Sequence, residues 1–506
     1  MDRKGSTLLI VLSVMSLLSV LGASLLKVTI NDAVNARRQV DSHKALFLAE
    51  AGLQRAAWLI KQDDGSLKTK DHTERFSFKD GQIVVNDAGE VTINIHYLGN
   101  DRYKVTSSSQ YGSVSKTLYS LDQANAPAKV FDYVYFINNW GWFYGSPITS
   151  YGDVRSNGRF DFKYGPTVNS DIYAGNEVGI NGTVYGYGRH EQYQHGHSET
   201  LPMPNLNDLS YYKNNATGTI KIDGHILVNG VLGDNSGEKD NIVLIGTQNH
   251  PIEINGTVVI EGDVVVSGYI TGQGVIYSGR NIYVPNNIIY VNPPSAERPE
   301  YPVDAPPDWK TVDTFVAENQ TKDLVGFAAS ENIVLGDYTA SKNQWIFNYY
   351  LYYMGDEDVG IDGIPDTGDE GEGDGIFEAR YEDLDGDGIK DDHYVFADLD
   401  TQVSITDFAN VPAGVKKYSD IATNPDTYTP GETTIDGIFY TNHAITGRPE
   451  GACTINGAII SKDEAIGISS IVMNYDWRIN SRYSENGKNI IDLPFAKKVT
   501  ILRWWD

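Results

Sequence analysis

The sequence predicts a mainly β protein carried on one long N-terminal α-helix. An uncharged apolar run opens the chain at residues 6–26, glycines recur at regular intervals beyond about residue 129, and carboxylates concentrate at residues 356–400. The 506 residues include 50 Gly and 32 Tyr, and 41% of them are apolar, which is typical of a β-rich, turn-rich globular body. We therefore expect an α+β N-terminal region followed by a parallel β-helix with an acidic insertion.

The apolar run is long enough to form a membrane-spanning helix. It extends from Ser6 to Leu26, and a helix of about 20 residues crosses a hydrocarbon core of roughly 30 Å. Arg3 and Lys4 precede the run, so the positive-inside rule places the N-terminus in the cytoplasm and the body outside it. No Ala-x-Ala-like site follows the run, which argues against a cleaved secretory signal.

Helical periodicity continues beyond the apolar run. Small and apolar residues recur near a 3.6-residue period, at Val34, Ala45, Leu48, Ala49, Gly52, Leu53, Ala56, Ala57 and Ile60. We therefore expect one helix over residues 6–62 that is apolar all round in its first half and amphipathic in its second half. Such a helix suits a rod that leaves the bilayer and packs one face on a globular head.

The N-terminal region contains two short motifs, Lys4-Gly5-Ser6-Thr7-Leu8-Leu9 and Ala49-Glu50-Ala51-Gly52-Leu53-Gln54-Arg55-Ala56. With these motifs the region resembles the N-terminus of PilX-like type IV pilus assembly proteins, which are minor pilins. The resemblance implies a prepilin leader at residues 1–5, cleavage by prepilin peptidase after Gly5, and Ser6 as the methylated first residue of the mature chain. Major pilins carry a glutamate where this chain has Ile10. Because that glutamate is thought to pair with a neighbouring subunit's terminal amine, the resemblance points to a minor, initiating or tip subunit. The K-type minor pseudopilins of type II secretion also lack it.

The resemblance is confined to this N-terminal helical region, and it also implies partners and a location. The partners are other pilin subunits, the inner-membrane assembly platform and, through the helix, membrane lipid. The location is the inner membrane before assembly and then an extracellular filament at the cell surface. An ordinary single-pass anchor with an extracellular domain is the alternative.

Residues 63–124 alternate apolar and polar side chains over several short runs, with turns at Asn100-Asp101 and Tyr111-Gly112. This pattern predicts a small antiparallel sheet against the helix. Residues 123–128 contain Ala-Pro-Ala and are typical of a linker.

The pattern beyond residue 129 predicts a parallel β-helix over residues 129–292. Short β-branched segments alternate with glycines at six-residue spacing, as in Gly256, Gly262, Gly268 and Gly274, and earlier in Gly218, Gly224 and Gly230. A sandwich with regular hairpins is the alternative. A Pro-rich crossing and mixed segment follows at 293–354, the acidic insertion at 355–400, and final β-helix rungs with C-terminal strands at 401–506. In that last part, the corners at Asp436-Gly437 and Asn456-Gly457 are separated by about the length of one coil.

The acidic insertion repeats a pattern that fits calcium, which takes six to eight oxygen ligands on a flexible loop. Each copy has acceptors at positions 1, 5 and 9 and glycine at position 6, where a sharp turn is needed. The third copy is a full Asp-x-Asp-x-Asp-Gly and has Tyr394 in place of the EF-hand glutamate, so it resembles thrombospondin type 3 or dockerin-like loops. Gly360 stands at position 3 of the first copy, and a solvated acidic loop is the alternative. The expected ligands are Asp358, Asp362 and Asp366; Glu370, Glu372, Asp374, Ile376 and Glu378; and Asp383, Asp385, Asp387, Ile389 and Asp391, with the two isoleucines acting through backbone carbonyls.

Other features bound the function. A net charge of −27 argues against a nucleic-acid partner, because such a partner needs a basic face. One cysteine, Cys453, allows no intramolecular disulfide and is expected to be buried. The three histidines between His190 and His197 suggest a transition-metal loop, although exposed loop histidines are the more common case. The aromatic run from Trp140 to Tyr144 suits either sugar stacking or a cap on the β-helix.

No nucleophile-elbow, phosphate-loop or dinucleotide motif stands in a suitable context, and we expect no enzyme. The sequence thus favours a non-catalytic minor pilin or pseudopilin-like subunit that helps pilus assembly, tip display, adhesion or secretion. The alternative is a membrane-tethered adhesin or a carbohydrate-binding or carbohydrate-active β-helix protein that recognises a surface glycan.

Overall fold

The computed structural model describes residues 3–62, 66–79, 82–86, 89–99, 102–124, 128–175, 179–302, 304–343, 346, 371, 373–376, 405–467, 469–484, 490–495 and 499–505. The chain divides into two compact units. Unit 1 holds residues 1–126 and 497–506, and unit 2 holds residues 127–496. The prediction of a mainly β protein with a long N-terminal helix is confirmed.

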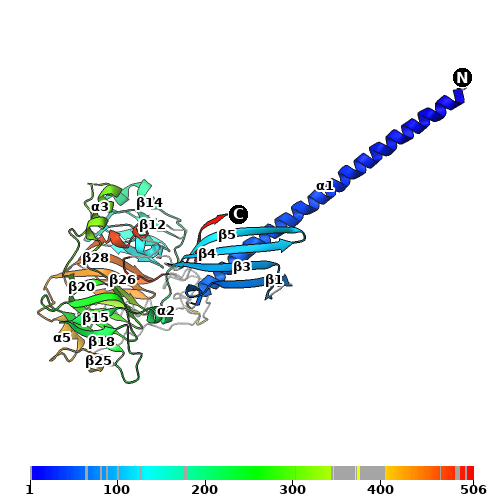
Figure 1. Ribbon diagram of the computed structural model, residues 1–506. Coiled ribbons are helices and arrows are strands. Elements are labelled where there is room, and N and C mark those ends of the chain that lie inside the picture. The colour runs from blue at the N-terminus through cyan, green and yellow to red at the C-terminus, as the bar shows by residue number, and fades with distance from the viewer. Residues whose placement is uncertain are drawn as a thin grey trace. The chain divides into compact units, whose positions relative to one another are not determined.

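Unit 1 is a long helix packed on one antiparallel sheet. Helix α1 (Arg3–Gln62) is continuous over 60 residues and projects well beyond the sheet (Figure 1). The described strands run in the order β2-β1-β3-β4-β5-β31, with bounds β1 (His72–Lys79), β2 (Gln82–Val85), β3 (Val91–Gly99), β4 (Arg102–Tyr111), β5 (Val114–Ala124) and β31 (Val499–Trp505). The C-terminal strand β31 pairs antiparallel with β5, so both ends of the chain contribute to this unit.

Two halves of α1 differ in exposure. The side chains from Leu8 to Val40 are exposed, whereas Ala45, Ala49, Leu53, Ala56 and Ile60 are buried. These buried residues recur every three or four positions and form one face of the helix, and those from Ala49 onward pack in one cluster with Phe76, Val91, Ile93, Val105 and Leu118 of the sheet. Val34, which continues the same sequence stripe, is 44% exposed because the sheet does not reach it.

Unit 2 is built from short parallel strands that pair in three long ladders. The first ladder follows the order β17 (Val231–Leu232), β19 (Ile252–Ile260), β20 (Val264–Ser278), β23 (Leu324–Ala329), β26 (Glu432–Thr441), β28 (Ala452–Ser461), β6 (Tyr135–Ile137), β9 (Val154–Ser156), β12 (Ile172–Ala174) and β14 (Gln194–His195).

The second ladder contains β25 (Phe408–Ala409), β18 (Asn241–Gly246), β20, β21 (Ile282–Val284), β24 (Ile333–Gly336), β27 (Ala444–Arg448) and β29 (Asp463–Ile466). The third ladder contains β19, β20, β22 (Ile288–Tyr290), β26, β28, β30 (Ser470–Tyr475), β8 (Ile148–Tyr151) and β11 (Thr167–Asn169). A separate described sheet pairs β7 (Gly141–Tyr144), β10 (Phe160–Lys163) and β13 (Ile180–Gly182).

The longest strands turn corners at glycines and so join two ladders. Gly437 pairs with Gly457 at φ angles of +150° and +151°, as the repeated corner in the sequence predicts. Gly256 also pairs with Gly274, and the φ angle of Gly256 is +71°. A Cβ at Gly457 would collide with the carbonyl oxygen of Gly437, so the close approach of stacked strands requires glycine there.

One glycine series behaves differently. The spacing of Gly218, Gly224 and Gly230 matches that of the parallel region, but β15 (Thr219–Ile222) and β16 (His225–Asn229) form an antiparallel hairpin. Asp223 and Gly224 both have positive φ, so a tight turn reverses the chain between the two strands.

Short helices lie between the strands of unit 2: α2 (Ser210–Asn214), α3 (Trp309–Asn319) and α5 (Tyr418–Ala422). The short 3₁₀ segments are η1 (Ser66–Lys68) in unit 1, and η2 (Lys129–Asp132), η3 (Tyr187–Arg189), η4 (Glu191–Tyr193), η5 (Ile405–Asp407), η6 (Trp477–Ile479) and η7 (Ser481–Tyr483) in unit 2.

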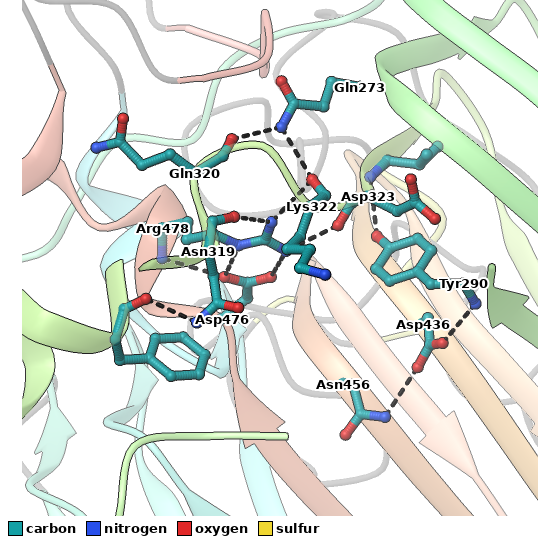
Figure 2. Close-up of polar contacts among 12 residues, drawn as sticks. Gln273, Tyr290, Asn319, Gln320, Lys322, Asp323, Asp436, Asn456, Asp476 and Arg478 are labelled. Atoms are coloured by element: carbon teal, nitrogen blue, oxygen red, sulfur yellow. Dashed lines mark hydrogen bonds and ion pairs between the residues drawn. The ribbon is translucent and has the colours of Figure 1, made fainter. Parts of the chain in front are cut away.

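Buried polar side chains tie these elements to the ladders. Asp436 accepts from the Tyr290 backbone N–H at 2.7 Å and from Asn456 at 2.8 Å, which links three successive strands (Figure 2). Arg478 is 1% exposed and pairs with Asp476 through Nε at 2.9 Å and Nη2 at 2.6 Å. Its other bonds reach the backbone carbonyls of Asn319, Lys322 and Asp323 at the end of α3. A buried cation thus satisfies the carbonyl of the last residue of α3 and two carbonyls of the segment that follows the helix.

The strands do not stack in the order of the sequence. β28 pairs with β6, which places Ile459 beside Tyr135, and β30 pairs with β8, which places Ile471 beside Ile148. The stretch at residues 135–195 therefore continues the ladders from residues 452–475. One hydrophobic cluster contains side chains from both stretches, including Phe136 and Ile459.

Candidate functional site

The N-terminal helix carries the first group of expected functional residues. Gly5 and Ser6 lie within the backbone of α1. The described part of this helix, Leu8–Lys61, is long and apolar enough to cross a membrane. Ile10, at the position where the resemblance expects a glutamate in major pilins, is 60% exposed.

Gly52 lies at a close approach between the helix and the sheet. A Cβ built at this position would lie 2.9 Å from Val91 Cγ1 and 3.1 Å from Ile93 Cγ2, and still closer to Ser107 Oγ. All three distances are shorter than ordinary van der Waals contact. The glycine of the Ala-Glu-Ala-Gly-Leu motif therefore has a packing role that its spacing alone does not reveal.

Most of the predicted calcium ligands lie outside the described residues. These are Asp358, Asp362, Asp366, Glu370, Glu372, Glu378, Asp383, Asp385, Asp387, Ile389 and Asp391. Asp374 and Ile376 of the second copy are described: Asp374 Oδ1 accepts from the Ile376 backbone N–H at 2.7 Å. Gly375, at position 6 of that copy, has a φ of +77°, in the left-handed region that a sharp turn uses. Calcium binding stays a prediction.

The histidine loop does not gather its imidazoles. His195 Nε2 lies 3.0 Å from Asp171 Oδ2, whereas His190 Nε2 lies 3.6 Å from Asp304 Oδ2. His197 is exposed and has a φ of +59°. Within the described part of the chain, no group of three or more His, Cys, Asp or Glu side chains is placed to hold a metal ion.

The aromatic run lines a cavity of about 370 Å³ in unit 2. Trp140, Trp142 and Tyr144 are half-buried, and their rings lie 5.1–6.3 Å apart between centroids. Phe143 is 3% exposed, and it both belongs to the hydrophobic core and lines the cavity. Half-buried and buried side chains alternate along β7, and both kinds contribute to the cavity lining.

Two polar side chains enter this cavity lining from the second ladder, Glu464 on β29 and Arg448 on β27. Glu464 is 5% exposed, and burial raises its pKa to about 8. Tyr135 Oη donates to Glu464 Oε2 at 2.9 Å, and the Ile466 backbone N–H donates to Oε1. Sequence reasoning missed both residues, because neither stands in a recognisable motif.

Neighbouring charged residues form a buried group beside the cavity. Burial raises the pKa of Asp463 to about 6, while Lys462, Asn139 and His443 oppose that rise. Asn139 donates to Asp463 Oδ2 at 3.1 Å. Cys453 is 1% exposed, as expected for a small buried side chain, and burial raises its pKa to about 12.

No protein-family model matches the chain, and no curated protein matches it. Among solved structures, the chain is similar to the competence-associated pilin ComZ from Thermus thermophilus. The two share 10% identity with a TM-score of 0.31, over 92% of this chain and 97% of that chain.

Proposed function

We propose that the chain is a non-catalytic, PilX-like minor pilin or pseudopilin-like subunit of a type IV filament. The observation that carries this proposal is the build of α1, whose apolar first half is exposed and whose second half packs a stripe of small residues on an antiparallel sheet. A helix of this kind can sit in a bilayer before assembly and beside other subunit helices afterwards. The motifs around Gly5 and Gly52 support the same assignment.

In this proposal the body stands outside the inner membrane and is displayed at or near a filament tip, where it assists assembly, adhesion or secretion. Its partners are other pilin subunits, the inner-membrane assembly platform, prepilin peptidase and membrane lipid. We also propose that the three ladders of unit 2 are the faces of a parallel β-helix. The pairing of Gly256 with Gly274 and of Gly437 with Gly457, each across one coil, supports this interpretation.

Calcium is proposed as the ion of the acidic insertion. Its carboxylates would repel one another without cations, at about 1 to 4 kcal/mol for each close pair at effective dielectric constants between roughly 80 and 20. The three-copy pattern supports the proposal, and the Asp374–Ile376 turn is compatible with it.

N-terminal processing tests the pilin assignment. Mass analysis of the protein extracted from membranes should find a first residue of Ser6 carrying a methyl group. A Gly5→Leu variant should keep the leader, whereas Gly22→Ala, a glycine change elsewhere in α1, should be processed normally. An intact Met1 in the unmodified chain, or a first residue beyond Leu26, would refute the pilin assignment.

A further inference from the structure

The second ladder of unit 2 is interrupted where the two stretches of chain meet. At this junction the first ladder continues through β28 and β6, and the third ladder continues through β30 and β8. β29 and β7 occupy the corresponding positions of the second ladder, yet they belong to separate sheets among the described strands. Two stacks that are not joined in sequence thus meet along two ladders and part along the third.

Side chains take the place of ladder bonds at this interruption. Just before β7 and β29, one backbone hydrogen bond still joins the two stretches of chain: the Asn139 N–H donates to the Lys462 carbonyl at 3.1 Å. Beyond that point, Trp142 Nε1 donates to the Glu464 carbonyl at 3.2 Å, and Tyr135 Oη bonds the Glu464 carboxyl. Side-chain hydrogen bonds therefore bridge β29 to β6 and β7 in place of backbone ladder bonds, and residues of β7 and β29 line the cavity of about 370 Å³.

The cavity has an aromatic wall and an apolar floor. Trp140, Trp142 and Tyr144 form the wall, and Ile459, Ile471 and Met473 contribute to the floor. Glu464 and Arg448 are its charged side chains. Its volume lies within the range of small-molecule sites, roughly 300–1,000 Å³. A ligand that fits must therefore combine an apolar face with polar edges.

Two cations and one carboxylate contact the aromatic wall from outside the cavity lining; the carboxylate is that of Asp161, which accepts from Trp140 Nε1 at 2.9 Å. The Lys163 ammonium lies 4.2 Å from the centre of the Tyr144 ring, and the Arg159 guanidinium lies 5.0 Å from the centre of the Trp140 ring. Arg159 also pairs with Asp161 at 3.2 Å, whereas Arg448 lines the cavity itself and is not ion-paired with a described carboxylate. Local charge therefore favours an anionic ligand.

We propose that the cavity between β29 and β7 binds a pyranose ring that carries a carboxylate, as in a uronic-acid unit of a polysaccharide. The C–H face of such a ring packs on Trp142, its hydroxyl groups bond Glu464, and its carboxylate pairs with Arg448. Because burial keeps the Glu464 carboxyl protonated near neutral pH, it does not repel the acidic sugar. The aromatic side chain of a peptide would fill the same volume without using either charged residue.

This site does not depend on the pilin assignment, since every residue involved lies in unit 2. A chain that fails to be processed at Ser6 can still bind sugar, and a processed chain can fail to bind it. The two proposals are therefore distinguished by separate measurements.

The test is a binding titration of the detergent-purified full chain with galacturonate, glucuronate and neutral glucose oligomers. Acidic oligomers should bind, and Trp142→Ala should weaken their binding by about tenfold or more, since truncating a central aromatic anchor has effects of that size. Arg448→Gln should weaken acidic oligomers selectively. Trp504→Ala, which removes a 58% exposed tryptophan of unit 1, is the matched control and should bind normally.

A second variant guards against loss of folding. Tyr144→Ala removes a half-buried ring without touching the Trp142–Glu464 bond, and its melting curve should match that of the unmodified chain while binding falls. Absence of binding by any acidic oligomer at millimolar concentration overturns the proposal. So does binding that is confined to neutral oligomers or unchanged in both aromatic variants, or capture of aromatic peptides in preference to sugars.

Discussion

Replacing Gly52 by alanine tests the packing of α1 on the sheet of unit 1. The new methyl group would lie 2.9 Å from Val91 Cγ1 and closer still to Ser107 Oγ. Overpacking of a buried contact costs about 1–3 kcal/mol, whereas Gly→Ala in a helix interior gains up to about 1 kcal/mol. We therefore expect the free energy of local opening of the unit 1 sheet to fall by about 1–2 kcal/mol.

Hydrogen exchange followed by mass spectrometry measures this loss where it occurs. Peptides from β3, β4 and β5 should exchange about 5- to 30-fold faster in Gly52→Ala than in the unmodified chain, which is the factor that about 1–2 kcal/mol produces. Peptides of unit 2 should be unchanged.

Two further variants make the result specific. Gly22→Ala is the matched control, because a Cβ at Gly22 meets no atom within 4 Å, and exchange in the sheet should stay the same. Ser107→Ala removes the hydroxyl nearest to the new methyl group, so the double variant should recover part of the lost protection. Exchange in Gly52→Ala that equals or falls below that of Gly22→Ala would refute the close-contact argument.

Three other perturbations follow from buried or clustered charge. Folding raises the pKa of Glu464 from 4.5 to about 8, so the contribution of this carboxyl to stability is full below pH 4.5 and is lost as the pH rises through 8. The melting temperature of Glu464→Gln should therefore exceed that of the unmodified chain at about pH 9 and differ little from it at pH 4.5. The control variant Glu318→Gln, which changes an exposed side chain, should show no such trend. Arg478→Met should cost about 3–5 kcal/mol in urea unfolding, because it leaves Asp476 buried without its partner; a loss below about 1 kcal/mol would contradict this. Millimolar calcium should raise the melting temperature of residues 28–506, and chelator should lower it. The double variant Asp385→Ala with Asp387→Ala should abolish most of that shift. Identical melting curves with calcium and with chelator would refute the calcium site and indicate a solvated acidic loop.

Local pattern was sufficient for the elements whose environment is set by near neighbours in sequence. The helix of unit 1 follows from an uncharged run and a 3.6-residue stripe, both of which depend on residues a few positions apart. The pairing of Gly437 with Gly457 follows from a sequence repeat, since two parallel strands with the same pattern place equivalent residues side by side. The burial of Cys453 follows from its residue type.

Long-range pairing was decided by the tertiary structure alone. Residues 135–195 stack on residues 452–475, and β31, near the C-terminus, completes a sheet whose other strands lie near the N-terminus. Strand edges carry the same backbone groups whatever their place in the sequence, so periodicity does not say which edges meet. The hairpin at Gly224 shows the same limit, because its glycine spacing equals that of the parallel region.

The sequence by itself determined a long N-terminal helix with an apolar first half, a β-rich body with glycine corners and a concentrated acidic segment, because each of these depends on residues that are close along the chain. The tertiary structure decided the order of the stack, the contact at Gly52 and the cavity beside Trp142. Each of these depends on two segments that are remote in sequence meeting in space. The aromatic run can be seen in the sequence, but Glu464, whose backbone carbonyl accepts from Trp142, is brought beside it only by the junction of two stretches from opposite ends of unit 2.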